Sequence, residues 1–246
     1  MNREGVSVGP DDFVGRTLRA PKERCSRFTR LILKYADSQR PLEVLDLGCG
    51  TGEQVFDLAE AMPTARFTGV DISAANIRAA EDVRERHACR ERMTFVATDY
   101  MELRTTPFDL ILSWGVLHLI PAPTGALFSK IASDLNRGGL LVSATPYRCL
   151  HNSALGLVRR VLRAIRSHAT DRAILALSQY LYGAQYPEPF LRERVFYMYC
   201  PANRYDSPNL HEFLRTMCGL ELVGIHPEPR ISRLQFKHRI SVFRKR

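Results

Sequence analysis

The stretch from Val44 to Glu53 constrains this chain more than any other part of its sequence. It reads VLDLGCGTGE, which predicts a buried parallel strand over Val44–Leu47, then a glycine-rich turn, then a helix. Glycines at positions 48, 50 and 52 can take positive φ and let a ligand approach the main chain without meeting a Cβ. The first turn of the following helix points free N–H groups at such a ligand. We therefore predict that this turn binds a ligand.

The glycine spacing separates this turn from two other nucleotide-binding motifs. It is G-x-G-x-G rather than G-x-G-x-x-G, and it lacks the Lys-Ser/Thr pair of a phosphate loop. The string DLGCGTG resembles the first motif of class I S-adenosylmethionine-dependent methyltransferases; the alternative is the glycine-rich turn of another nucleotide-binding α/β protein. The resemblance implies that the methyl donor, and its product S-adenosylhomocysteine, contact Asp46, Gly48, Cys49, Gly50 and Gly52.

Two acidic residues close the next two predicted strands. The second strand ends at Asp71, about 20 positions beyond the glycine turn, where a carboxylate can accept both hydroxyls of a ribose. The side chain of Ile72 either presses on the adenine face or packs in the core. The third strand is followed by Asp99, which the resemblance assigns to the adenine amino group, with the backbone N–H of Tyr100 on a ring nitrogen. An Asp that closes a strand is otherwise a turn residue.

The segment after the fourth predicted strand, SWGVLHLI, resembles the fourth motif of the small-molecule branch of the same family. The resemblance places Ser113 and Trp114 beside the methionine end of the donor, near the transferred methyl. His118 lies in the same loop and is the first candidate for a general base; otherwise it is a surface or packing histidine. The loop contains neither N-P-P-Y/F nor Pro-Cys, so it does not indicate the best-marked DNA-methylating branches.

The order of predicted elements indicates an α/β fold. As far as the fifth strand, Leu140–Ala144, strands alternate with helices as in a doubly wound, mostly parallel sheet with helices on both faces. A helix over Thr124–Leu135 is expected to end at a glycine cap in residues 136–139. Two later strands are predicted over Leu220–Ile225 and Phe236–Phe243. The family resemblance implies seven strands in the order 3-2-1-4-5-7-6, with strand 7 antiparallel and a helical cap inserted between strands 5 and 6.

The chain divides into four predicted parts. They are an N-terminal segment with a lid helix (1–40), the donor-binding core (41–146), a Tyr- and Arg-rich helical substrate cap (147–206) and the C-terminal part of the core sheet (207–246). The N-terminal segment includes a loop over residues 1–20 and a helix over Lys22–Asp37. In the resembled family such a helix lies over the cofactor site; otherwise it packs on the core.

The cap carries two features that could contact a partner. A basic amphipathic helix is predicted, with one stripe formed by Leu155, Val158, Leu162 and Ile165 and the other by Arg159, Arg163 and Arg166. It could lie on an anionic membrane, cap an anionic substrate or present a solvated face. Six of the nine tyrosines then fall within 26 residues, where they either bind a flat or anionic acceptor or form the core of the cap. We expect the acceptor to meet Tyr186, Arg192, Tyr197, Tyr199 and Arg204.

The charge of the chain is uneven. Residues 1–139 hold 18 Lys and Arg against 19 Asp and Glu, whereas residues 140–246 hold 17 against 7. This excess could attract an anionic substrate, nucleic acid or a membrane surface, although 30 Arg against 5 Lys also indicates a general bias towards Arg. With no secretory signal and no run near the ~20 apolar residues of a membrane span, we expect a cytoplasmic protein, with peripheral membrane contact left open. The six scattered cysteines indicate reduced thiols.

Three hypotheses of function follow. The first is an enzyme that moves a methyl group from S-adenosylmethionine by in-line displacement to O, N or C of a small molecule of natural-product or lipid-like type. Orientation alone can supply about 7–11 kcal/mol of such a barrier, and a base, His118 or else a tyrosine such as Tyr147, helps only if the acceptor loses a proton. No metal site is indicated. The second hypothesis is an RNA methyltransferase, and the third is a non-catalytic S-adenosylmethionine-binding regulatory module.

Overall fold

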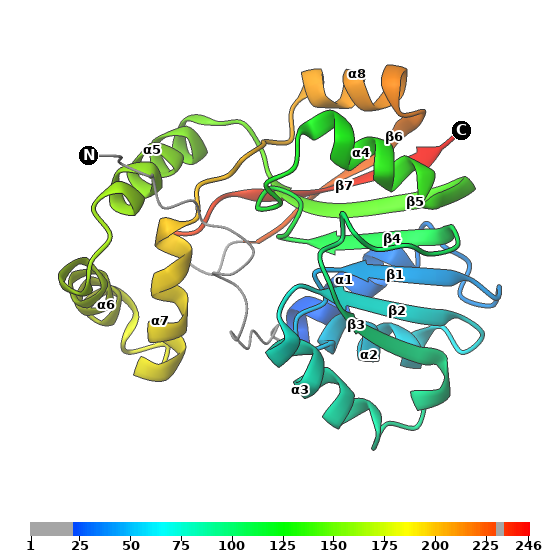
Figure 1. Cartoon of the computed structure of the whole chain (residues 1–246), viewed down its shortest axis with the longest axis horizontal. Helices are drawn as coiled ribbons and strands as arrows, with labels where there is room; N and C mark the ends of the chain where they lie inside the picture. The colour runs from blue at the N-terminus through cyan, green and yellow to red at the C-terminus, as the bar shows by residue number, and fades with distance from the viewer. Residues whose placement is uncertain (1–21, 230–233) are drawn as a thin grey trace.

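Short apolar segments form parallel strands at the centre of the fold, because each is covered on both faces. They are β1 (Glu43–Leu47), β2 (Arg66–Asp71), β3 (Met93–Ala97), β4 (Phe108–Trp114) and β5 (Leu135–Pro146). The computed structural model describes residues 22–229 and 234–246, and in these β6 (Leu220–Pro227) and β7 (His238–Lys245) complete a seven-stranded sheet. The strand order is β3-β2-β1-β4-β5-β7-β6, and β7 is antiparallel to both neighbours (Figure 1). The predicted fold class and strand order are confirmed.

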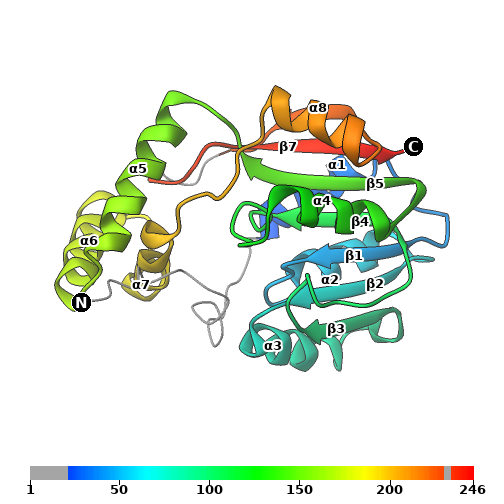
Figure 2. The ribbon, with the colours of Figure 1, turned by 45° about the horizontal axis from the view of Figure 1, so that its top comes forward.

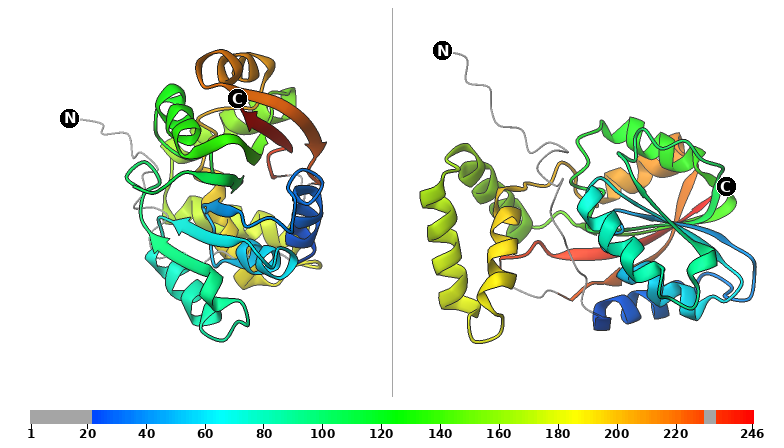
Figure 3. Two further views of the ribbon diagram at one scale, coloured as in Figure 1. Left: turned by 90° about the vertical axis from the view of Figure 1, so that its right-hand side faces the viewer. Right: turned by 60° about the horizontal axis from the view of Figure 1, so that its bottom comes forward.

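Helices cover both faces of this sheet. Neighbouring strand residues point to opposite faces, so Val44 and Leu45 enter different apolar cores. The first core is closed by α1 (Lys22–Ile32), α2 (Glu53–Ala61) and α3 (Ala74–Arg84), and the second by α4 (Thr124–Ser133) and α8 (Pro208–Met217). The right-hand view of Figure 3 shows α1, in dark blue, on one side of the sheet and α4 and α8, in green and orange, on the other. The short helix η2 (Arg90–Arg92) leads into β3.

A lobe of helices is inserted after β5. It consists of α5 (Leu150–Ala164), α6 (His168–Tyr182), α7 (Glu188–Val195) and η3 (Phe196–Tyr199). The lobe has a small apolar core of its own, formed by Ile174, Val195 and Tyr199. Figure 2 shows that it lies beyond the carboxyl ends of the parallel strands, at the edge of the sheet where β1 enters the glycine turn. The insertion therefore covers the edge at which the predicted ligand site lies.

Two local predictions were wrong. The first helix ends at Ile32 rather than Asp37, and the chain continues in turns. Residues 136–139 are not a helix cap but part of β5, which starts at Leu135 directly after α4. Gly138 has a φ of 78° at an irregularity in the pairing of β5 with β4, so this glycine serves a bulge in a strand. The predicted loop over residues 1–20 lies outside the described residues.

Helix α5 is turned differently from its predicted orientation. Arg159, assigned to its polar face, is buried, and its guanidinium donates to the carbonyls of Cys200 at 3.2 Å and Leu234 at 3.1 Å. Val158 and Ile165, assigned to its apolar stripe, are exposed. The carbonyls around Arg159 accept from both terminal nitrogens of a guanidinium that pattern alone assigns to solvent. Among the described helices, none combines the length and the apolar character needed to span a bilayer.

Candidate active site

The backbone of the turn after β1 strongly favours glycine at three positions. Gly48, Gly50 and Gly52 have φ values of 78°, 57° and 86°, in the left-handed region that residues with a Cβ rarely enter. A Cβ on Gly48 would lie 2.3 Å from the Val116 side chain, and one on Gly52 would lie 2.9 Å from the Phe95 ring. The turn is therefore packed against β3 and the loop after β4.

The carboxylate of Asp71 is fixed by the turns around it. It accepts hydrogen bonds from the backbone N–H of Gly50 at 2.9 Å and of Ser73 at 2.8 Å, and from the side-chain amide of Asn76 at 3.2 Å. A carboxylate has about four acceptor positions, so it can still receive a hydroxyl group. Ile72 follows it, is half-buried and belongs to neither core of the described sheet. This position leaves its side chain available to a ligand.

Asp99 and Tyr100 follow β3, and their side chains make different contacts. One carboxylate oxygen of Asp99 accepts the backbone N–H of Met101 at 2.9 Å. The side chain of Tyr100 is buried away from the glycine turn, and its hydroxyl donates to Asp134 at 2.8 Å, beside Lys130. Burial and the Asp134 carboxylate raise the pKa of this phenol, which stays protonated. The phenol therefore supports α4, while the prediction for residue 100 concerned its backbone N–H.

Three carboxylates crowd around the glycine turn. Asp46 is buried, and its burial together with Asp71 and Glu53 raises its pKa to about 7. Within residues 22–229 and 234–246, no ion pair joins any of the three to a basic side chain. Burial also raises the pKa of the Cys49 thiol well above its usual value, so this cysteine is neutral. The turn is a negative, partly desolvated site that favours a cationic ligand.

The end of β4 carries Ser113 and the only tryptophan of the chain. Ser113 is fully buried, and its hydroxyl has no hydrogen-bond partner among the described residues. The ring of Trp114 stacks on Phe28 of α1 with 5.1 Å between centroids, and the Arg24 guanidinium lies 3.8 Å from its centre. Its indole N–H is also buried without a partner in the described part of the chain. Helix α1 thus closes over the residues predicted to flank the donor.

His118 is buried in the loop that follows. Its ring lies against His238 of β7, 5.5 Å between centroids, and against Phe236 at 6.2 Å. Burial, together with His238, Arg159 and Arg204, lowers its pKa well below the usual value, so the ring is neutral at pH 7. Its Nδ1 atom has no partner among the described residues. The described residues therefore do not fix which ring nitrogen carries the proton; a ligand beside the ring would fix it.

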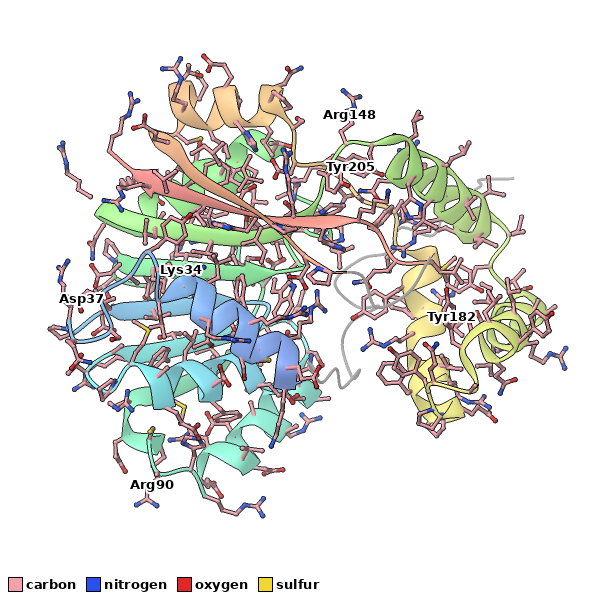
Figure 4. The ribbon with its side chains drawn as sticks, turned by 180° about the vertical axis from the view of Figure 1, so that it is seen from behind. Lys34, Asp37, Arg90, Arg148, Tyr182 and Tyr205 are labelled. Atoms are coloured by element: carbon pink, nitrogen blue, oxygen red, sulfur yellow. The ribbon has the colours of Figure 1, made fainter. Side chains whose placement is uncertain are left out.

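A cavity of about 220 Å³ lies beside Trp114 and His118, between the core and the inserted lobe. The core also contributes Arg24 and His238 to its wall. The lobe contributes aromatic and basic side chains, among them Tyr182, Tyr186, Phe190, Arg194 and Tyr197. Figure 4 shows Tyr182 within the lobe, on α6. Two predicted acceptor residues, Tyr186 and Tyr197, therefore line the cavity.

Other predicted acceptor residues are held elsewhere. Arg192 forms an ion pair with Glu188 on the exposed side of α7. The hydroxyl of Tyr199 donates to Asp171 at 2.6 Å inside the small core of the lobe. Arg204 is buried and donates to main-chain carbonyls of the loop after β4, those of Leu117, Ile120 and Ala122. Tyr147 lies at the end of β5, with Arg239 over its ring, and does not line the cavity.

The cavity also contains residues that the sequence did not single out. Arg24 is four positions before Phe28, so the two side chains share a face of α1. This spacing could have indicated that Arg24 lies beside the ring that Phe28 contacts. His238 gave no signal, because only the antiparallel insertion of β7 brings it beside His118. Within the described residues, no group of three or more His, Cys, Asp or Glu side chains is placed to hold a metal ion.

Comparison with known families agrees with this geometry. A family model described as a methyltransferase domain matches residues 38–193, which is more than half of the chain. The chain belongs to the methyltransferase family. This membership confirms the resemblance that the motifs at Asp46 and Ser113 indicated.

Individual relatives of this methyltransferase share the same region. It is 34% identical over 146 residues to the malonyl-[acyl-carrier protein] O-methyltransferase of Legionella pneumophila, a match that covers 58% of this chain and 48% of the relative. It is 36% identical over 155 residues to the tRNA (guanine-N(7)-)-methyltransferase of Chloroflexus aggregans, covering 60% and 64%. The matches thus span less than two thirds of either relative.

A solved structure matches nearly the whole chain. The magnesium protoporphyrin IX methyltransferase of Synechocystis PCC 6803, solved with bound S-adenosylhomocysteine, is aligned over 92% of this chain and 83% of its own. The TM-score is 0.60 and the sequence identity is 18%. At this identity the match shows a shared fold.

Proposed function

We propose that this protein transfers a methyl group from S-adenosylmethionine to a small-molecule acceptor bound in the cavity beside Trp114 and His118. The observation that carries the proposal is the group of carboxylates at the glycine turn, which lacks a basic partner in the described residues. The methyl donor carries a positive sulfonium and ammonium group, which such a site would stabilise. The family membership and the solved relative with bound S-adenosylhomocysteine support the same donor.

The residues at the strand ends fit such a donor. Asp71 would accept a ribose hydroxyl at its remaining acceptor position, and Ile72 would lie on the adenine face, with Asp99 and the N–H of Tyr100 at the adenine edge. The glycine turn and Asp46 would hold the amino acid end of the donor. Beside it lie Ser113 and Trp114, whose hydroxyl and indole N–H are buried without a hydrogen-bond partner in the described residues. When bound, the sulfonium supplies an activated methyl group that a nucleophile can displace directly.

The cavity wall supports a flat acceptor that carries negative charge. The rings of Tyr186 and Phe190 stack with 4.8 Å between centroids, and the Arg194 guanidinium lies 4.3 Å from the Phe190 ring centre. The Nε of Arg194 is buried without a partner in the described residues. Buried donors of this kind cost free energy until an acceptor oxygen meets them. A carboxylate or an acidic hydroxyl would meet both the charge and the missing hydrogen bond.

His118 would receive the proton of such an acceptor. Because burial lowers its pKa, the ring is neutral at pH 7 and has a free lone pair, but it is a weak base. A weak base suffices for an acidic hydroxyl, and a carboxylate needs none. The histidine thus fits oxygen acceptors that ionise easily better than amines or alcohols.

Two substitutions test the site. Asp71→Ala should abolish binding of S-adenosylmethionine, followed by quenching of Trp114, the only tryptophan; normal binding in this variant refutes the donor site. His118→Ala should lower turnover at least about tenfold with unchanged donor affinity, whereas His168→Ala, at an exposed position of α6, should have no effect. Full activity of His118→Ala would exclude the histidine as base.

An RNA methyltransferase is the second candidate. The net charge of +10 in residues 140–246 and the similarity to a tRNA methyltransferase favour it. It predicts RNA binding that weakens steeply with salt, because contacts to phosphates release counterions. Failure to bind RNA at low salt would rule it out.

A further inference from the structure

The inserted lobe exposes an apolar face on each of its two longest helices. Seven of the thirteen large apolar side chains that are exposed in the described residues lie on α5 and α6, and an eighth, Ile165, directly follows α5. Leu150, Leu157, Val158 and Val161 of α5, with Ile165 at its C-cap, fall within an arc of about 100° at 3.6 residues per turn. Leu150 is 91% exposed, and the others are about half exposed. Monomeric proteins rarely leave such a stripe uncovered without a partner.

Helix α6 repeats the pattern. Leu177, Tyr180 and Leu181 are exposed, at 52%, 87% and 46%, and follow Ile174, which is buried in the lobe about one turn before Leu177. Figures 1 and 2 show that α5 and α6 form the end of the molecule farthest from the sheet. We define the outer cap face as these exposed residues of α5 and α6.

The charge around the outer cap face is positive. Residues 148–182 contain six arginines, of which Arg159 is buried on the inner side of α5, and one acidic residue, Asp171, whose carboxylate accepts the Tyr199 hydroxyl. Arg148, Arg160 and Arg172 are exposed and form no ion pair with a described residue. Figure 4 shows the Arg148 side chain projecting away from the body of the protein. Apolar side chains flanked by arginines match a surface that is apolar below and negatively charged above, as an anionic bilayer is.

We propose that the outer cap face docks on the surface of an anionic lipid bilayer. The apolar side chains of α5 and α6 enter the boundary between headgroups and acyl chains, while the arginines contact lipid phosphates. Neither helix crosses the bilayer. The inner sides of the same helices, through Arg159 and Tyr182, line the cavity of the proposed acceptor site. Docking therefore brings that cavity beside the membrane surface.

A second copy of the chain fits the outer cap face less well. Self-association about a two-fold axis places the same patch against itself, so the exposed arginines of both copies would come together. The chain carries a net charge of +9, which adds to this repulsion. An anionic membrane meets the same arginines with opposite charge. The charge pattern thus favours lipid over a dimer.

Co-sedimentation of the full-length protein with vesicles tests the proposal without donor or acceptor, so its outcome is independent of the proposed activity. Binding to vesicles of phosphatidylcholine with phosphatidylglycerol should be at least about tenfold tighter than to phosphatidylcholine alone. The double variant Leu157→Asp, Val161→Asp should bind the anionic vesicles at least about one hundredfold more weakly than the unmodified protein does. Val83→Asp is the matched control, because Val83 is exposed to a similar degree on α3, and it should bind as the unmodified protein does.

A second variant keeps the test decisive if the double apolar variant unfolds. Arg160→Glu with Arg172→Glu should remove the preference for anionic vesicles and leave thermal unfolding unchanged, because both side chains are exposed. The proposal is overturned if the unmodified protein ignores anionic vesicles, or if the folded variants bind as it does. It is equally overturned if sedimentation shows a dimer that the Leu157 and Val161 substitutions dissociate.

Discussion

Replacing Asp46 with Asn should stabilise the ligand-free protein above neutral pH and weaken its binding of S-adenosylmethionine. Asp46 is buried at the end of β1, and burial together with Asp71 and Glu53 raises its pKa from 3.8 to about 7. The raised pKa means that ionising this carboxyl costs more free energy in the folded protein than in the unfolded chain. Asparagine keeps the shape of the side chain and cannot ionise, so it removes that cost and also the negative charge that a cationic donor requires.

The magnitude follows from the two pKa values. Below pH 3.8 the carboxyl is protonated in both the folded and the unfolded chain, and it makes no difference to stability. Between pH 3.8 and about 7 only the folded protein holds the proton, so stability falls by about 1.4 kcal/mol per pH unit. Above about pH 7 the loss is complete at about 4 kcal/mol. In a chain of this size such a loss lowers the thermal midpoint by roughly 10 °C.

Thermal unfolding of the unmodified protein and of Asp46→Asn between about pH 5 and about pH 8 measures this effect. The buried histidines, His118 and His238, have lowered pKa values and change stability in the opposite direction below pH 6.5. Both are present in both proteins, so the difference between the two midpoints cancels them. We expect Asp46→Asn to gain relative stability as the pH rises, and to show a smaller quench of Trp114 with S-adenosylmethionine. A difference that does not depend on pH, or equal donor affinities, would refute the reasoning.

Three further substitutions test the packing. Gly52→Ala should lower the free energy of unfolding by about 1–3 kcal/mol, because residue 52 has a φ of 86° and its Cβ would lie 2.9 Å from the Phe95 ring; denaturant titration measures this. Tyr199→Phe should cost about 1 kcal/mol without changing donor affinity, since its hydroxyl donates to Asp171 at 2.6 Å. For Asp206, burial opposes ionisation, but hydrogen bonds from His211 and two further side chains lower its pKa to about 2. Its contribution to stability is present above pH 3.8 and is lost as the pH falls through 2; acid unfolding of Asp206→Asn should lack this step.

The core and the glycine turn could be predicted because their signals are local. Each parallel strand is a short apolar run, and a residue at its end, such as Asp71, has its position fixed by the strand itself. The three glycines take the left-handed conformation that their spacing indicated. The family resemblance supplied the position of β7, which no local pattern contains.

The walls of the cavity could not be predicted in the same way. They depend on contacts between residues far apart in the chain, such as His118 with His238 and Arg24 with Trp114. The predicted orientation of α5 was wrong for a related reason, because the carbonyls that receive Arg159 come from the residue after η3 and from the segment before β7. Periodicity assigns an arginine to solvent, and only the tertiary structure shows that its two terminal nitrogens find carbonyl acceptors inside.

The loop after β4 links the two halves of the proposed site. It carries Trp114 at the donor end and His118 at the cavity, and the segment that leads from the lobe back to α8 holds it in place. Asn203 donates its backbone N–H to the carbonyl of His118 at 2.8 Å, and Arg204 donates to three further carbonyls of the loop. A change in α6 or α7 can therefore reshape the cavity without moving this loop, because its main chain is fixed from residues 203 and 204. The arrangement lets acceptor specificity vary while the position of the donor stays constant.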